Sequence, residues 1–133
     1  MTSHVFQPLA ALLVDGDSVS RQSVAAVLAG IGYGRIWEAS SMVQALPHLD
    51  QPWFDLAVVD LAVAEAEGYD LISLLGSRVE AVGRVVAIAE TADEQLIHAA
   101  LRRGASAVLP KPIDRVALAS AGLVERRRAP RAA

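Results

Sequence analysis

The sequence predicts one α/β domain built on a doubly wound, five-stranded parallel sheet with helices on both faces. Short apolar runs alternate with longer segments of helical periodicity, and each crossover between parallel strands needs such a segment to return the chain. The runs at residues 56–59 and 85–89 lack polar alternation, which is typical of strands buried on both faces. A length of 133 residues suits a single domain that buries a real core.

The first strand and the first helix are expected near the start of the chain. The apolar run at 9–14 predicts a strand. Val24, Leu28 and Ile31 then recur at the spacing of one helical face. The segment Gly32-Tyr33-Gly34 is expected to end this helix as a turn. The other strands are expected at 36–39, 56–59, 85–89 and 107–109.

Four more helices are expected after the second strand. A short one at 41–46 should end at Pro47, because proline does not continue a helix. Longer helices are expected at 69–79 and 93–103, and Asp114 is the expected N-cap of the last one. The sides expected to pack inward carry Leu71, Leu74, Leu75 and Val79 in the helix at 69–79, Leu96, Ala100 and Leu101 in the helix at 93–103, and Val116, Ala119 and Leu123 in the last helix.

Composition and charge exclude several classes of protein. The chain has no cysteine, which excludes disulfides and cysteine-based zinc sites, and its 3 histidines are too scattered for a histidine metal site. A net charge of −3 argues against a domain built to grip nucleic acid. No apolar run approaches the roughly 20 residues of a membrane span, and the N-terminal run lacks the basic flank of a signal peptide. We therefore expect a cytoplasmic protein, with an N-terminal extension at 1–8, one domain at 9–124 and a basic, flexible tail at 125–133.

Carboxylates and a lysine follow three of the expected strands. The first strand ends in Asp15-Gly16-Asp17, the third ends in Asp60, and Lys111-Pro112 follows the fifth. Because the carboxyl ends of parallel strands meet at one edge of the sheet, these side chains should converge. Carboxylate oxygens suit Mg²⁺, and an aspartate beside a metal and a lysine can take a phosphoryl group. Any of these aspartates taken alone is more often a helix cap, so the prediction depends on the whole set.

Three stretches resemble the receiver domain of two-component response regulators: LLVDGDSVSRQSVAAVL, FDLAVVDLAVAEAEGYDLI and GASAVLPKPID. The resemblance runs from Leu9 to Leu123 and implies a flavodoxin-like sheet with the strand order 2-1-3-4-5. It implies that Asp60 accepts a phosphoryl group and that Lys111 contacts the phosphate. Asp15 matches the first member of the family's acidic pair.

The resemblance also implies a metal and two backbone features. Mg²⁺ would be held by Asp15 and Asp60, with Asp17 as a third candidate. Gly68 matches the glycine that opens the third helix, and the Lys111-Pro112 bond would be cis, as in the family.

Three positions depart from the family's pattern. The second member of the acidic pair, which contacts the metal, is replaced by Gly16. The hydroxyl residue that ends the fourth strand falls on Ala89, and Thr91 lies two residues further along. The aromatic residue that moves with that hydroxyl falls on Val108. Both halves of the usual conformational switch are absent, so we expect the phosphoryl group to act on the fourth helix by another route.

The expected function is that of a stand-alone receiver domain in a phosphorelay. It would take a phosphoryl group on Asp60 from a histidine kinase or a phosphotransfer protein and would not otherwise be an enzyme. A downstream protein or a second copy would dock on the fourth helix, the fifth strand and the fifth helix, where His98, Arg102 and Arg103 are expected to point outward. Neither nucleic acid nor a membrane is an expected partner.

Two alternatives remain open from the sequence. Gly16, Ala89 and Val108 would also suit an interaction module that kept the receiver fold and lost phosphorylation. The stretch LLVDGDSVS also matches the opening of haloacid-dehalogenase-like phosphohydrolases, with Asp15 as nucleophile and Asp17 as acid and base. The chain lacks the later acidic motif of those enzymes, and that alternative leaves Asp60 and the lysine-proline segment unexplained.

Overall fold

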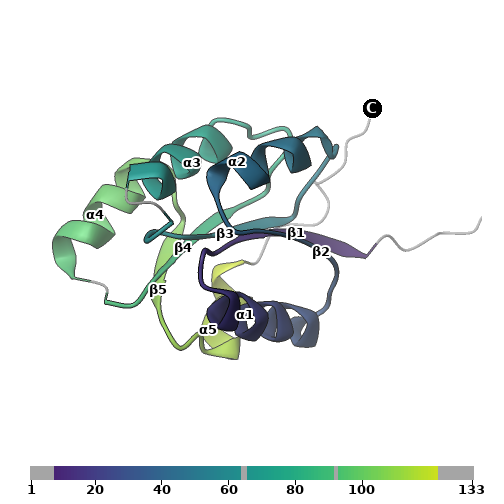
Figure 1. The fold of residues 1–133 in the computed structure, drawn as a ribbon, viewed down its shortest axis with the longest axis horizontal. Coiled ribbons are helices and arrows are strands. Elements are labelled where there is room, and N and C mark those ends of the chain that lie inside the picture. The colour runs from purple at the N-terminus through teal and green to yellow at the C-terminus, as the bar shows by residue number, and fades with distance from the viewer. Residues whose placement is uncertain (1–7, 64–65, 92, 123–133) are drawn as a thin grey trace, which may run out of the picture.

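The computed structural model describes residues 8–63, 66–91 and 93–122, which form a five-stranded parallel sheet between two layers of helices (Figure 1). The sheet order is β2-β1-β3-β4-β5, and all four strand pairs are parallel. This confirms the expected doubly wound, flavodoxin-like order. The strands are β1 (Leu9–Val14), β2 (Tyr33–Ala39), β3 (Leu56–Asp60), β4 (Val85–Ala89) and β5 (Ala107–Pro110).

The helices divide between the two faces of the sheet. Helices α2, α3 and α4 cover one face, and α1 and α5 cover the other (Figure 1). Every residue of β3 and β4 is buried, as their uninterrupted apolar sequences predict. The helices are α1 (Ser18–Ile31), α2 (Met42–Ala45), α3 (Ala66–Gly76), α4 (Glu94–Arg102) and α5 (Arg115–Ala121), and a 3₁₀ helix η1 spans Leu46–Asp50.

Each face of the sheet has its own hydrophobic core. Alternate residues of one strand point to opposite faces, so Leu12 and Val14 of β1 belong to the core under α2, α3 and α4, whereas Ala11 and Leu13 belong to the core under α1 and α5. This division holds the central strands β1 and β3 rigidly between the helix layers. The residues that follow these strands are therefore presented from a fixed frame.

The first helix and the strand after it differ in part from the expectation. Helix α1 ends at Ile31, and Gly32 adopts a φ of 129°, a conformation that favours glycine. The expected turn at Gly32-Tyr33-Gly34 is wrong beyond its first residue, because β2 begins at Tyr33. Tyr33 pairs with Leu9 of β1, and its buried side chain packs in the core beside α1.

Helix α2 ends at Ala45 with Leu46 as its C-cap, so the expected end of this helix at Pro47 is confirmed. The chain continues as η1, and Pro47 lies in its first turn, where its missing N–H costs nothing. Three side chains expected to pack inward from the helices are exposed instead. Val79 lies beyond the end of α3 and is exposed, and Leu101 is exposed on α4. In α5, Val116 is exposed because Leu118 takes the buried place, while Asp114 caps the helix as expected. Leu123, most of the expected N-terminal extension and the basic tail lie outside the described residues.

Within the described residues, no helix has the length and apolar character needed to cross a membrane.

Candidate functional site

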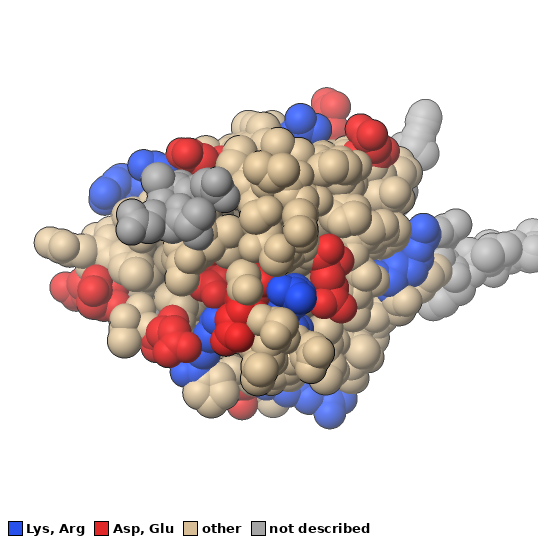
Figure 2. Space-filling view, in the orientation of Figure 1, with Lys and Arg blue, Asp and Glu red and all other residues tan. Residues whose placement is uncertain are grey.

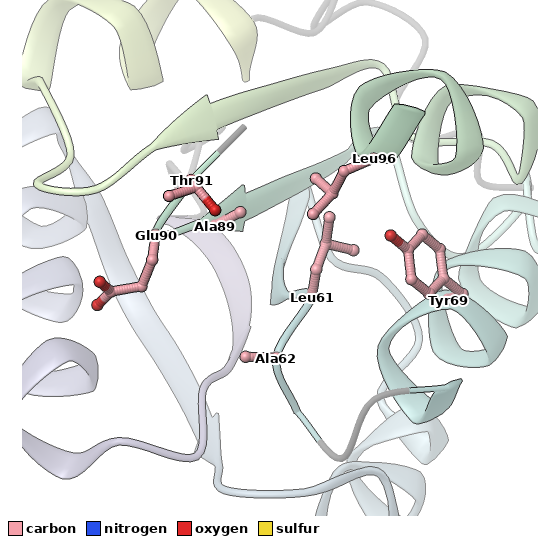
Figure 3. Close-up of a pocket in the computed structure, with 7 residues that line it drawn as sticks. All are labelled: Leu61, Ala62, Tyr69, Ala89, Glu90, Thr91 and Leu96. Atoms are coloured by element: carbon pink, nitrogen blue, oxygen red, sulfur yellow. The ribbon is translucent and has the colours of Figure 1, made fainter. Parts of the chain in front are cut away.

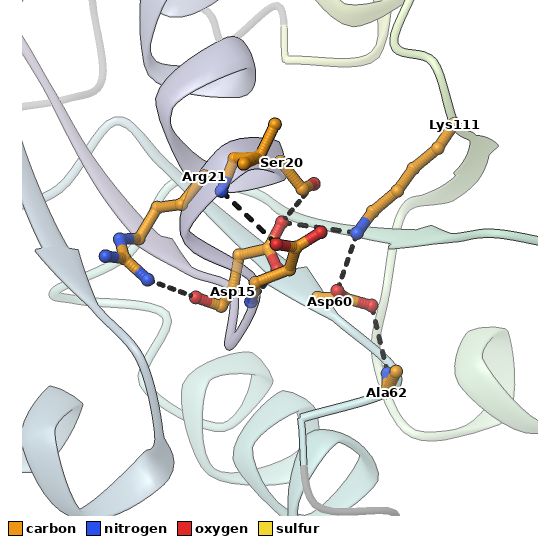
Figure 4. A network of polar contacts seen from close by, with 8 residues as sticks. Asp15, Ser20, Arg21, Asp60, Ala62 and Lys111 are labelled. Carbon is orange, nitrogen blue, oxygen red and sulfur yellow. Dashed lines mark hydrogen bonds and ion pairs between the residues drawn. The ribbon is translucent and has the colours of Figure 1, made fainter.

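Asp15, Asp60 and Lys111 meet at the carboxyl edge of the sheet (Figure 4). Asp15 directly follows β1, Asp60 is the last residue of β3, and Lys111 directly follows β5. The ammonium Nζ of Lys111 donates to Oδ2 of Asp60 at 2.8 Å and to Oδ2 of Asp15 at 3.3 Å. The convergence predicted from the sequence is therefore confirmed for these three side chains, while Asp17, the fourth of the predicted set, caps α1 instead.

The two carboxylates are almost completely removed from solvent. Asp15 has an exposed fraction of 0% and Asp60 of 3%, and they are the buried charged residues of the described chain. Buried carboxylates are costly unless paired and hydrogen-bonded. Here a single lysine, whose side chain is 11% exposed, lies between the two. One cation for two buried anions leaves a site that retains negative charge.

Helix α1 supplies further donors to Asp15 that the sequence analysis missed. The Ser20 hydroxyl donates to Asp15 Oδ2 at 2.6 Å, and the backbone N–H of Asp17 donates to Oδ1 at 3.0 Å. Arg21 donates from Nη1 to the backbone oxygen of Asp15 at 2.8 Å (Figure 4). Its Nε pairs with Glu38 at 3.2 Å. The sequence contains a signal for these contacts. Ser20 and Arg21 come five and six positions after Asp15, and residues at that spacing face a strand-end aspartate from the first turn of the following helix.

Asp60 is fixed from its own loop. The backbone N–H of Ala62 donates to Oδ1 of Asp60 at 3.0 Å, while Oδ2 accepts from Lys111 (Figure 4). Gly68, in the first turn of α3, packs closely on this loop: a Cβ there would lie 2.9 Å from the carbonyl oxygen of Leu61. Glycine is therefore required where the helix approaches the strand end.

These contacts shift the three ionisation equilibria in different directions. Burial raises the pKa of Asp15, but the hydrogen bonds from Ser20 and the Asp17 amide and the charge of Lys111 outweigh it, so the pKa is lowered. Burial and the neighbouring Asp15 raise the pKa of Asp60 despite the opposing bond from Lys111. Burial lowers the pKa of Lys111, but its two carboxylate partners raise it overall. The lowered pKa favours the anion of Asp15. The raised pKa means that Asp60 binds a proton more readily than Asp15 does.

The expected set of three carboxylate ligands is not assembled in the described part of the chain. No group of three histidine, cysteine, aspartate or glutamate side chains lies close enough together to hold a metal ion there. Asp17 is exposed and serves as the N-cap of α1, where its Oδ1 accepts from the backbone N–H of Val19 at 3.2 Å. Asp17 directly precedes α1, and its carboxylate accepts a hydrogen bond from one of the otherwise unpaired backbone amides in the first turn of that helix.

A pocket of about 550 Å³ opens beside the strand that carries Asp60 (Figure 3). Ala89, at the end of β4, forms part of its wall. Val108, half-buried in β5, packs against the core on the side of α4. The small side chain of Ala89 leaves this space unfilled. The pocket is lined by Leu61, Ala62, Tyr69, Ala89, Glu90, Thr91 and Leu96.

Exposed carboxylates surround the site. In Figure 2 acidic side chains lie near the centre of the visible face, with basic side chains among them. Asp17, Glu38, Glu90 and Asp93 are exposed in β2 or just after β1 and β4. Such a surface attracts cations and disfavours the phosphate backbone of nucleic acids.

Comparisons with known proteins agree with this geometry. The sequence profile of the response regulator receiver domain matches residues 11–122. The fold is similar to that of a response regulator protein from Burkholderia pseudomallei, solved with a phosphorylated aspartic acid, a calcium ion and citrate, with a TM-score of 0.76 and 24% identity. That match covers 86% of this chain and 66% of the Burkholderia protein, so the chain spans slightly less than two thirds of that relative's length.

Two further solved structures show the same fold. A CheY-like receiver domain protein from Methanospirillum hungatei matches with a TM-score of 0.72 and 23% identity over 86% of this chain and 90% of its own. The CheX–CheY–BeF₃–Mg complex from Borrelia burgdorferi matches with a TM-score of 0.74 and 23% identity over 86% of both chains. The cis bond at Lys111-Pro112 also agrees with the expectation from the sequence. The profile match over most of the chain shows that the protein belongs to the response regulator receiver domain family of two-component signalling.

Proposed function

We propose that Asp60 accepts a phosphoryl group from a phosphohistidine of a histidine kinase or of a phosphotransfer protein. The observation that carries this proposal is the ammonium of Lys111, which lies 2.8 Å from Asp60 and bridges it to Asp15. A phosphoryl group on Asp60 brings additional negative charge into the site, and Lys111 is the cation placed to neutralise it.

The transfer itself needs little from the protein beyond placement and charge. A carboxylate oxygen of Asp60 attacks phosphorus, the bond between phosphorus and the histidine nitrogen breaks, and the imidazole leaves with the electron pair. Asp60 must react as the anion, the form that Lys111 stabilises through its hydrogen bond. Ala62 holds one carboxylate oxygen through its backbone N–H at 3.0 Å, which fixes the orientation of the nucleophile.

The donor set fits Mg²⁺. Asp15 and Asp60 offer hard oxygen ligands at one edge of the sheet, and Mg²⁺ is commonly held by one or two carboxylates while it keeps several waters. Asp15 and Asp60 would hold the ion, which when bound neutralises the phosphoryl oxygens. The exposed carboxylate of Asp17 is engaged as a helix cap and is not needed for this set.

The phosphorylation signal would reach a partner protein that binds the surface formed by α4, β5 and α5. His98, Arg102 and Arg103 are exposed on or just after α4, so this surface can meet a downstream protein or a second copy of the chain. Because Ala89 offers no hydroxyl to a phosphoryl group, a shift of α4 would be driven from the Asp60 loop or through the pocket, which Ala62 of that loop and Leu96 of α4 both line.

The two alternatives differ in how well the contacts support them. Loss of phosphorylation with retention of the fold stays a second candidate, because Gly16 and Ala89 remove two groups that the family uses. The phosphohydrolase alternative needs Asp17 as a free acid and base, whereas its carboxylate accepts the N–H of Val19 and the family match does not favour it.

Intact-mass measurement after incubation with acetyl phosphate tests the proposal. The natural chain should gain one phosphoryl group in the presence of Mg²⁺ and none without it, and Asp60→Ala should gain none. A folded chain that gains nothing would favour the interaction module. Hydrolysis of a generic phosphate ester, lost in Asp15→Asn and kept in Asp60→Asn, would instead favour the phosphohydrolase.

A further inference from the structure

We propose that Ser20 is the positioning residue of the metal site: its hydroxyl holds the carboxylate of Asp15 in the orientation that a divalent cation needs, in a site where the residue after Asp15 is Gly16 and not an acid. This inference rests on the proposed function, because it concerns the same Mg²⁺. It goes further by giving a role to a residue of α1 that supplies no charge.

Both carboxylate oxygens of Asp15 accept hydrogen bonds. Oδ2 of Asp15 accepts from the Ser20 hydroxyl at 2.6 Å, and Oδ1 accepts from the Asp17 amide at 3.0 Å. The 2.6 Å distance is in the usual range for a hydroxyl that donates to a carboxylate, which is among the stronger hydrogen bonds of proteins. With Asp15 completely buried, these donors leave its side chain one orientation.

The Ser20 hydroxyl also opposes the pull of Lys111 on the same oxygen. Lys111 Nζ lies 2.8 Å from Asp60 but 3.3 Å from Asp15, so the ammonium is closer to Asp60. Without the hydroxyl, Asp15 Oδ2 would have Lys111 as its main partner, and the two carboxylates would close around the ammonium. A divalent cation would then have to displace Lys111 from both carboxylates. In the observed arrangement, the hydrogen bond from Ser20 of α1 keeps Asp15 from closing on Lys111 in this way.

Gly16 explains why this support matters here. A carboxylate at position 16 would add a ligand and a negative charge, but glycine adds neither. With only two acidic ligands, the affinity for the cation depends more strongly on how well each is oriented. Residues that hydrogen-bond a metal ligand commonly contribute about 10-fold to metal affinity.

A different role for Ser20 would be local and structural. Serines in the first turn of a helix often bond to nearby backbone groups, but the Ser20 hydroxyl donates to a side chain five residues earlier in the sequence, across the loop between β1 and α1. Ser23 lies on the same helix and is exposed. It offers a matched control for the loss of one serine hydroxyl from α1.

Calorimetric titration with Mg²⁺ tests the inference on four full-length chains: the natural protein, Ser20→Ala, Ser20→Thr and Ser23→Ala. We expect Ser20→Ala to bind Mg²⁺ about 10-fold more weakly. Ser20→Thr, which keeps the hydroxyl, should restore the affinity, and Ser23→Ala should leave it unchanged. Circular dichroism on each variant checks that the fold is retained.

The possible contrary results separate this inference from the proposed function. Equal affinity in the natural chain and in Ser20→Ala would overturn the role of Ser20 while leaving Mg²⁺ binding intact. Equal losses in Ser20→Ala and Ser20→Thr would assign the effect to packing and would also overturn it. If the natural chain binds no Mg²⁺, both the inference and the metal-dependent transfer to Asp60 fail.

Discussion

Lys111 Nζ lies 2.8 Å from Asp60 Oδ2, although 51 residues of sequence separate them. The contact exists because β5 and β3 run parallel with β4 between them, so the residues that follow both strands reach the same edge. The same lysine reaches Asp15 at 3.3 Å from the end of β1. One ammonium group therefore neutralises part of the charge of two carboxylates that lie at the ends of two other strands.

Replacing Gly16 by aspartate should strengthen Mg²⁺ binding. A Cβ at Gly16 would lie 3.4 Å from the nearest heavy atom, the backbone oxygen of Ser40, so the side chain can be accommodated at this exposed position. An added negative charge near the cation should lower the dissociation constant about 10-fold, on the order of 1.4 kcal/mol. Asp17→Asn is the control: asparagine still caps α1, and affinity should hardly change. A large loss in Asp17→Asn would instead identify Asp17 as a ligand.

Asp60→Asn should stabilise the metal-free protein at neutral pH. Burial and the charge of Asp15 raise the pKa of Asp60, so the folded state disfavours its anion. The stability contributed by this group is present below the pKa of an unfolded aspartate and is lost as the pH rises through the raised folded value. We expect a gain of about 1 kcal/mol in the free energy of unfolding near neutral pH, vanishing in acid. Urea denaturation with exposed Asp50→Asn as control measures it, and a loss of stability would contradict the assignment.

The buried Tyr33 should make the fold sensitive to alkali. Burial, with the charge of Asp55 adding to it, raises the pKa of Tyr33 to about 12 from the ordinary 10.0. The corresponding stability is fully present below pH 10.0 and is lost as the pH rises through about 12. The free energy of unfolding of Tyr33→Phe should fall less over this range, with a difference on the order of 2 kcal/mol at its alkaline end. Parallel curves for the two proteins would show that Tyr33 ionises freely in the folded state.

Gly68→Ala should destabilise the fold beside Asp60. The new Cβ would lie 2.9 Å from Leu61 O and 3.0 Å from Leu61 Cα, which are backbone atoms that can move only by shifting the loop after Asp60. We expect a cost of about 2 kcal/mol. Gly30→Ala in α1 is the opposite case, because its nearest neighbour is the flexible end of Arg115 at 4.0 Å, and alanine should stabilise the helix by about 0.5 kcal/mol. Thermal unfolding of both variants measures the difference, and equal effects would refute the close approach.

The sequence predicted the sheet and the central triad because both depend on strong local signals. Apolar runs without polar alternation mark β3 and β4, and strands of known order bring Asp15, Asp60 and Lys111 to one edge. Asp114 as a cap was likewise readable from its position before an apolar helix.

What the sequence missed depends on three-dimensional contacts. Helix periodicity alone does not say which side chain packs inward, and it predicts Val116 for the core where the structure buries Leu118. The glycines on either side of Tyr33 predict a turn, although pairing with β1 makes Tyr33 part of a strand. The acidic spacing predicts Asp17 as a metal ligand, but its nearest unpaired donors are the amides of α1. Ser20 carried no motif, and only the turn between β1 and α1 brings it to Asp15.

Mapping the phosphorylated residue is the most direct test of whether Asp60 accepts the phosphoryl group. The chain is treated with acetyl phosphate and Mg²⁺ and then with borohydride, which reduces an aspartyl phosphate to homoserine, and the peptides are sequenced by tandem mass spectrometry. We expect homoserine at position 60 alone, lost without Mg²⁺ and in Lys111→Ala. Homoserine at position 15, or an unmodified Asp60 in a folded chain that binds Mg²⁺, would contradict it.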